Sequence, residues 1–111
     1  MGYSRAVVVG DRIHVAGTAP IAADGGPPPE DAYEQARLCL QIIGEALERA
    51  GSGLEHVVRT RIYLTDPVHF EGVARAHGEA FAEVRPVNTT VVASLLDPAW
   101  KLEMEVEAVL P

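Results

Sequence analysis

Acidic side chains alternate along the C-terminal part of the sequence and are the first candidates for chemistry. Glu103, Glu105 and Glu107 stand at every second position, so in a β-strand the three carboxylates share one face. A carboxylate placed in a cleft can serve as a general acid or base when burial raises its pKa toward neutrality. We therefore take Glu105, the central one, as the candidate catalytic residue. The alternative is a solvated, charged sheet face with no catalytic part.

A second pair of polar side chains precedes this stretch. Asn88 and Thr90 are two positions apart, so on a strand both point to the same face, opposite to Thr89. An amide and a hydroxyl in one pocket can orient a polar ligand, and we expect this face to approach Glu105. The alternative is that Asn88 begins a strand and satisfies local backbone groups.

Arginines offer a possible anion-binding group. The run 57–65 has period two, which predicts a strand with Arg59 and Arg61 on one face. A guanidinium can bind a carboxylate through two parallel hydrogen bonds. The alternative is that these arginines pair with the glutamates across the sheet. The opposite face of this run is expected to hold Val58, Thr60, Ile62 and Leu64.

Other common catalytic arrangements are missing from the sequence. The four histidines lack metal-ligand spacing, so we expect no metal and no cofactor. Cys39 falls within an apolar helical stripe, which indicates a core residue rather than a nucleophile. No serine stands in a nucleophile-elbow motif, and no glycine-rich stretch forms a phosphate-binding fingerprint. The four histidines are His14, His56, His69 and His77.

The elements that position these residues follow from hydrophobic periodicity and turn signals. Asp31 is the predicted N-cap of a helix that ends before Gly51-Ser52-Gly53, and a loop rich in proline and glycine precedes it at 23–29. The predicted order is β-β-α-β-α-β-β. The strands are predicted at 6–9, 12–16, 57–65, 88–95 and 101–109, and the helices at 31–50 and 70–81, the second with Phe70, Val73, Ala74, His77 and Phe81 on its apolar face.

This order predicts a single α+β domain over 1–111, with both helices on one face of a mixed sheet. The other sheet face then needs a cover. Packing of further subunits in a closed cyclic assembly is the usual solution, and a chain of 111 residues gains from it because a small domain buries a limited share of its surface.

Composition excludes several classes of protein. Nine basic against sixteen acidic residues give a net charge of −7, which disfavours nucleic acid as a partner. No apolar run reaches the roughly 18 residues of a membrane span, and no signal-peptide core follows the first residues. A single cysteine fits a reducing compartment. We therefore expect a cytoplasmic protein with a small-molecule ligand.

Several motifs together resemble the RidA/YjgF family. Their order and spacing agree with the elements predicted above, and they span nearly the whole chain. They are Tyr3-Ser4, the stretch from Gly10 to Pro20, Gln35-Ala36, Ala50-Gly51, Val57 to Thr60, Tyr63 to Asp66, and Glu103 to Ala108.

The resemblance implies a RidA-like, chorismate mutase-like fold and a homotrimer whose intersubunit clefts hydrolyse reactive imines and enamines. It also implies that Tyr3 and Gly17 belong to the pocket and that Glu105 positions or activates water. The family's substrate-gripping arginine is replaced by Asn88 and its frequent cysteine by Thr90. Ala16 stands where the family has a serine, and Ala74 or Arg75 where it has an asparagine.

Two functions are therefore expected. The first is a divergent RidA-like hydrolase in which Glu105 acts on water, Tyr3 and Thr90 shape the pocket, and Asn88 orients the ligand. The alternative is a non-catalytic trimer that binds a small metabolite and regulates a partner. Arg61 or Arg75 is the candidate to restore the missing positive charge. The endoribonuclease label of some family members is disfavoured by the acidic charge of the chain.

Overall fold

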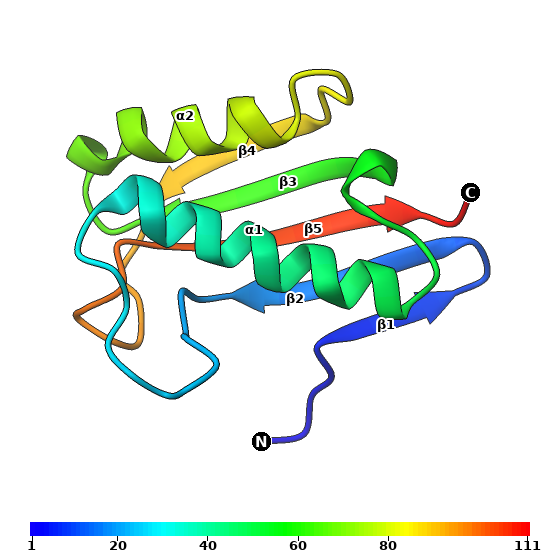
Figure 1. Cartoon of the computed structure of the whole chain (residues 1–111), viewed down its shortest axis with the longest axis horizontal. Coiled ribbons are helices and arrows are strands. Elements are labelled where there is room, and N and C mark those ends of the chain that lie inside the picture. Colours follow the sequence, from blue (N-terminus) through cyan, green and yellow to red (C-terminus); the bar gives the residue numbers. More distant parts are fainter.

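The computed structural model describes residues 1–111 and consists of one five-stranded sheet with two helices on the same face (Figure 1). The predicted order of elements and the α+β class are confirmed. The strands are β1 Ala6–Val9, β2 Arg12–Thr18, β3 Val57–Leu64, β4 Val87–Val92 and β5 Leu102–Val109, and the helices are α1 Ala32–Arg49 and α2 Phe70–Ala80.

The sheet is mixed, with the spatial order β1-β2-β5-β3-β4. All neighbouring strands are antiparallel except β3 and β4, which are parallel. β3 and β4 are parallel because helix α2, which lies between them in the sequence, returns the chain to the end of the sheet where β3 begins (Figure 1). β1 and β4 are the two edge strands of the sheet. Neither helix has the length and apolar character needed to cross a membrane.

Helix α1 begins and ends where the sequence signals predict. The side chain of Asp31 accepts a hydrogen bond from the backbone N–H of Tyr33 at the N-terminus. Gly51 follows the helix with a φ of +90°, a conformation that glycine adopts at low cost. The stripe that α1 packs against the sheet includes Ala36, Cys39, Leu40, Ile43 and Leu47.

Cys39 is fully buried in the core, as its place in the apolar stripe predicts. Burial raises the pKa of its thiol to about 12, and the negative charge of Glu103 adds to the increase. The thiol therefore stays protonated at neutral pH and is no nucleophile.

The apolar face of α2 is narrower than predicted. Val73, Ala76 and the following Phe81 are buried, but Phe70 is 52% exposed. Phe70 lies in the first turn of the helix, which extends past the end of β4 (Figure 1). The prediction that Phe70 joins the packed face is therefore wrong.

One residue of β3 also departs from the expected alternation. The pairing of β3 with β5 shifts between Val57 and Arg59, so Val57 is buried and Val58 is 43% exposed. A bulge inserts one residue and moves the side chains on its far side to the opposite faces. The predicted face is correct from Thr60 onward and wrong for Val58.

Candidate functional site

A pocket of about 300 Å³ lies where β2 ends and β5 begins. Tyr3 and Arg5 reach it from the segment before β1, Gly17 from the end of β2, and Glu103 from the start of β5. Trp100 lines it from the loop before β5. The pocket thus combines a carboxylate, a guanidinium, a phenol and an apolar wall, which suits a small polar ligand.

Strand register brings Gly17 against Glu103. Thr18 pairs with Met104 across β2 and β5, next to an irregularity in β2. A Cβ atom added to Gly17 would lie 2.7 Å from Oε1 of Glu103, so a side chain there would push the carboxylate aside. Glycine at this position therefore preserves the place of the Glu103 carboxylate.

Arg5 is held at the pocket by hydrogen bonds. Its Nη1 donates to Oγ1 of Thr18 at 2.6 Å and lies 3.3 Å from the carbonyl oxygen of Gly17 and 3.4 Å from that of Ala16. Thr18 is itself fixed, because its hydroxyl donates to the carbonyl oxygen of Ala16 at 2.8 Å. The guanidinium therefore has a defined position.

Of the residues predicted for the site, Tyr3 and Gly17 lie together in this pocket, but Glu105 is outside it. The hydroxyl of Tyr63 donates a hydrogen bond to Oε1 of Glu105, and Nη1 of Arg61 lies 4.0 Å from the same oxygen. The hydrogen bond to Glu105 raises the pKa of Tyr63, and desolvation adds to the increase. Glu105 thus belongs to a charged row in mid-sheet.

This row occupies the sheet face that the helices leave uncovered. Nε of Arg59 lies 3.5 Å from Oε2 of Glu107, and Nη1 of Arg61 lies 3.6 Å from Oε1 of the same residue. The alternative interpretation of the arginines, pairing with glutamates across the sheet, is therefore confirmed. Arg61 is engaged with Glu105 and Glu107 and does not line the pocket.

Arg75 is placed on the helical layer. Its guanidinium lies over the ring of Tyr33, 3.8 Å from the ring centre, a cation–π contact that joins α2 to α1. The hydroxyl of Tyr33 donates to Glu79, which adds a second link between the helices. Neither Arg61 nor Arg75 lines the pocket within this chain, and Arg5 is the guanidinium that does.

Asn88 and Thr90 point to the helix side of the sheet. Nδ2 of Asn88 donates to Oγ1 of the buried Thr60 at 2.9 Å, and Oγ1 of Thr90 donates to Oδ1 of Asn88 at 2.8 Å. The prediction that the two share a face is correct. Strand register places Thr89 and Glu105 on either side of Arg61, so Thr89 shares the glutamate face and Asn88 does not approach Glu105 of the same chain. The approach in a cleft between subunits stays a prediction.

A histidine completes this chain of hydrogen bonds. Oγ1 of Thr60 lies 2.8 Å from Nε2 of His77. Thr60 also accepts from Nδ2 of Asn88, so its hydroxyl links β4 to α2. Burial lowers the pKa of His77. Sequence spacing gave no sign of this role.

The lowered pKa of His77 predicts a pH-dependent stability. Neutral His77 is favoured in the folded chain, so its contribution is complete above the unfolded pKa of about 6.5 and is lost as pH falls toward the lower folded value. Urea unfolding from about pH 7.5 to about pH 5 should therefore show a larger loss for wild type than for His77→Gln. His69→Gln is the matched control, and equal slopes in wild type and His77→Gln would contradict the assignment.

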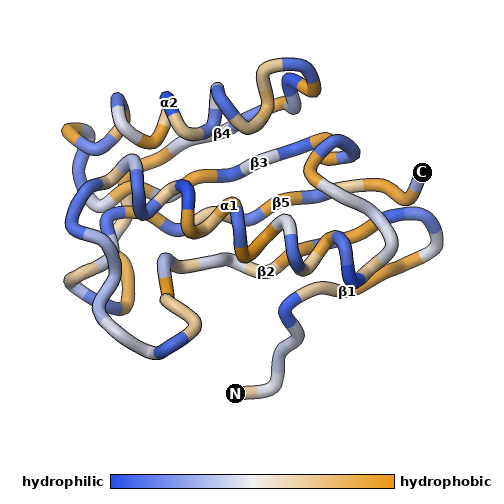
Figure 2. Tube along the Cα trace, in the orientation of Figure 1, coloured by the Kyte–Doolittle hydropathy of each residue, from blue (hydrophilic) through white to orange (hydrophobic).

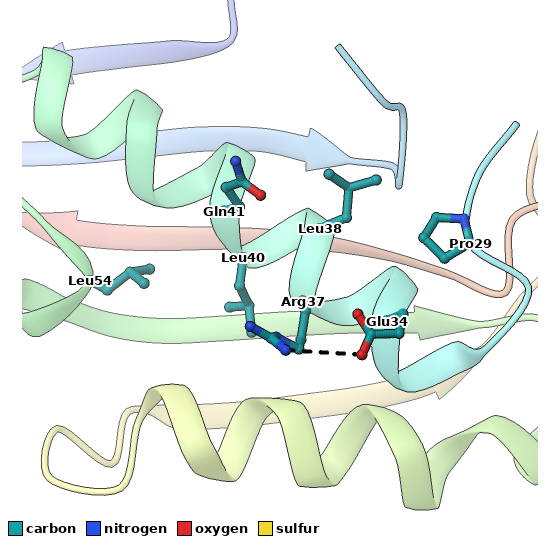
Figure 3. A pocket seen from close by; sticks show the side chains of 7 residues that line it. All are labelled: Pro29, Glu34, Arg37, Leu38, Leu40, Gln41 and Leu54. Atoms are coloured by element: carbon teal, nitrogen blue, oxygen red, sulfur yellow. Dashed lines mark ion pairs between the residues drawn. The ribbon is translucent and has the colours of Figure 1, made fainter. Parts of the chain in front are cut away.

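A separate hollow of about 520 Å³ lies along α1. Figure 3 shows that most of its side chains come from α1, whereas Pro29 and Leu54 come from the segments before and after the helix, and that Arg37 is turned toward Glu34. Their atoms Nη1 and Oε1 are 3.9 Å apart, and both side chains are at least half exposed. Such a pair contributes little, and no further charged side chain lines this hollow. The pocket beside Glu103 is therefore the stronger candidate.

The chain also holds no group of three or more His, Cys, Asp or Glu side chains arranged to bind a metal ion.

The fold and the pocket define a small α+β protein with helices on one sheet face and a polar pocket at the sheet end. The model of the family described as Endoribonuclease L-PSP matches residues 1–110. The chain belongs to this family, also known as the RidA/YjgF or RutC family.

Relatives and solved structures agree with this membership. An uncharacterized protein of Streptomyces coelicolor is 41% identical over 108 residues, which cover 96% of this chain and 81% of the relative. Rv2704 of Mycobacterium tuberculosis, a member of the YjgF/YER057c/UK114 family, is 38% identical, with a TM-score of 0.88 over 97% of this chain and 86% of that one.

A second similar structure contains a ligand. The structure of Escherichia coli TdcF with bound serine is 25% identical to this chain, with a TM-score of 0.91 over 100% of this chain and 90% of that one. Membership in this family supports a function related to small metabolites.

Proposed function

We propose that the chain forms a homotrimer in the cytoplasm and hydrolyses a small reactive imine or enamine in clefts between subunits. The observation that carries this proposal is the division of polar groups into two separate places. Tyr3, Gly17 and Glu103 lie at one pocket, whereas Asn88 and Thr90 lie on the edge strand β4 and on the other sheet face. A cleft between two copies can unite the two groups.

The two edges of the sheet support such an assembly. On β1, Val7, Val8 and Val9 are exposed, with 62% of Val9 accessible, and Figure 2 shows this strand as a hydrophobic run. On β4, Val87 and Val91 are exposed as well. Apolar patches on opposite edges favour a head-to-tail contact, which closes into a ring when the rotation fits.

Glu103 rather than Glu105 is the carboxylate that we propose for the reaction. It accepts a proton from water while the water oxygen bonds to the imine carbon, and it passes this proton to the imine nitrogen, which gives a carbon bearing one hydroxyl and one amino group. It then takes the hydroxyl proton and delivers it to the amino nitrogen as the carbon–oxygen double bond forms and the carbon–nitrogen bond breaks. The products are a carbonyl compound and ammonia. Tyr3 and Gly17 border the same space, and Asn88 of a neighbouring copy offers an amide donor and acceptor to the ligand.

The proposal is tested by oligomeric state and by turnover. Light scattering should give the mass of a trimer at micromolar concentration. 2-Iminobutanoate, generated by a threonine dehydratase, should decay faster with the protein than without it. A stable monomer would remove the cleft between subunits, and a decay rate equal to the background would remove the hydrolase.

The second candidate is a trimer that binds a small metabolite without turnover. It is favoured by the neutral Asn88, which stands where the family's arginine grips the substrate carboxylate. The structure of the similar protein TdcF contains bound serine, which makes serine the first ligand to test. Calorimetric binding of serine without accelerated imine decay would select this candidate over the hydrolase.

A further inference from the structure

We infer that Arg5 is the specificity-determining cation of the pocket and that, together with Glu103, it selects a small zwitterion. In this inference, which rests on the proposed function for the identity of the site, Arg5 binds the ligand carboxylate and Glu103 faces its protonated nitrogen. The positive charge that position 88 lacks is then supplied from the N-terminal segment.

Arg5 has hydrogen-bond donors to spare. A guanidinium carries five N–H hydrogens, two of them on each terminal nitrogen. Every hydrogen bond that Arg5 makes starts from Nη1, to Thr18 Oγ1 and toward the carbonyl oxygens of Ala16 and Gly17. Nε and Nη2 have no partner in the chain, and this adjacent pair of nitrogens is the part of arginine that forms two parallel bonds with a carboxylate.

Opposite charges line this pocket without neutralising each other. Neither Arg5 nor Glu103 takes part in any ion pair of the chain. Arg59 and Arg61, by contrast, are already engaged with glutamates. A ligand that brings one negative and one positive group satisfies both pocket residues, whereas a ligand with a single charge leaves one of them without a partner.

Arg5 and Glu103 both lie beside Gly17. Nη1 of Arg5 is 3.3 Å from the carbonyl oxygen of Gly17, and Oε1 of Glu103 is 2.7 Å from the position of a Cβ on the same residue. The two charges therefore lie beside one glycine, which suits a carboxylate and a protonated nitrogen on the same carbon or on neighbouring carbons. The apolar side of the pocket is formed by Ile21, Leu96 and Trp100.

The volume limits the size of the ligand. About 300 Å³ corresponds to roughly ten water molecules in the liquid. A short aliphatic side chain against Trp100 fits within this space, and a polymer does not. The ligand class is therefore a small amino acid or imino acid with a short apolar side chain.

The test compares three probes that differ in charge and are similar in size. 2-Aminobutanoate carries both charges, 2-aminobutanamide only the positive one, and 2-hydroxybutanoate only the negative one. Binding to the assembled protein is measured by calorimetry for wild type, Arg5→Gln, Glu103→Gln and Arg49→Gln. Glutamine at position 5 retains an N–H donor for Thr18, and Arg49, an exposed arginine in the last turn of α1, is the charge-matched control.

Wild type and Arg49→Gln should bind 2-aminobutanoate about tenfold to a hundredfold more tightly than either single-charge probe, the scale of one charged hydrogen-bonded pair. Arg5→Gln should lose a similar factor for both carboxylate probes and little for the amide. Glu103→Gln should weaken the two probes with a protonated nitrogen and spare 2-hydroxybutanoate.

Three results would overturn the inference. They are failure of wild type to bind any probe, equal losses for all probes in Arg5→Gln, and unchanged affinity in that variant. Light scattering and thermal unfolding of each variant separate lost folding from lost binding. The same variants separate this inference from the proposed hydrolysis. Binding that depends on Arg5, without turnover, would contradict only the hydrolase. Turnover that depends on Glu103, with an unchanged KM in Arg5→Gln, would contradict only the role of Arg5.

Discussion

Glu103→Gln should lower the rate of imine hydrolysis by about a hundredfold or more, whereas Glu105→Gln should leave it within a few-fold of wild type. A general base contributes typically 10²–10⁴-fold to a rate, and glutamine cannot accept the proton from water. Glu103 lines the pocket with Tyr3 and Gly17. Glu105 is committed to Tyr63 and Arg61 in the middle of the sheet.

The two substitutions form a matched pair, because both replace a half-buried glutamate of β5 on the same sheet face. Initial rates of 2-iminobutanoate decay, normalised to the concentration of assembled protein, give the comparison. A large loss in Glu105→Gln with activity retained in Glu103→Gln would reverse the assignment. Similar losses in both variants would show that the charge of the whole row, rather than one positioned carboxylate, supports the reaction.

Periodicity predicted which side chains of β5 share a face but could not say which of them borders a pocket. Glu103, Glu105 and Glu107 do alternate with buried Met104 and Val106. The distinction among the three comes from pairing. Thr18 lies opposite Met104 after an irregularity in β2, and this places Glu103 beside Gly17. Such a register depends on contacts between distant segments, and alternation along one strand does not contain it.

The sheet face on which Asn88 and Thr90 lie could not be predicted, for a similar reason. Alternation correctly grouped Asn88 with Thr90, yet the choice between the two sheet faces is made by the parallel pairing of Thr60 with Asn88. Because Thr60 faces the helices and is buried, Asn88 faces them too. His77 joins the network across the space between α2 and the sheet, and no spacing in the sequence marks that contact.

Arg5 was missed because it lies before the first strand, where no periodicity orients side chains. One signal was available. Arg5 is two residues after Tyr3, and residues two apart in an extended segment point to the same side. What fixes its position is the hydrogen bond to Thr18, a tertiary contact that follows only from the folded hairpin.

Gln35→Met should lower the free energy of unfolding by about 2–4 kcal/mol, because it removes three part-buried hydrogen bonds that contribute about 0.5–1.5 kcal/mol each. Gln35 is fully buried on α1. Its Nε2 donates to the carbonyl oxygens of Pro29 at 2.7 Å and Ala99 at 3.0 Å, and its Oε1 accepts from the N–H of Lys101 at 2.8 Å. Methionine has a similar volume and satisfies none of the three.

Gln41→Met is the control for this change, because Gln41 lies on the same helix, is exposed, and makes one side-chain hydrogen bond, to Glu45. Urea unfolding should show a change within about 0.5 kcal/mol for the control. The loops that Gln35 joins lie side by side at one end of the sheet (Figure 1), and one of them carries Trp100 and Leu96 to the pocket. Gln35→Met should therefore also raise KM for imine hydrolysis at a temperature where the variant is still folded. Equal stability of the two variants would mean that water replaces the lost partners and that the loop is held by its apolar contacts alone.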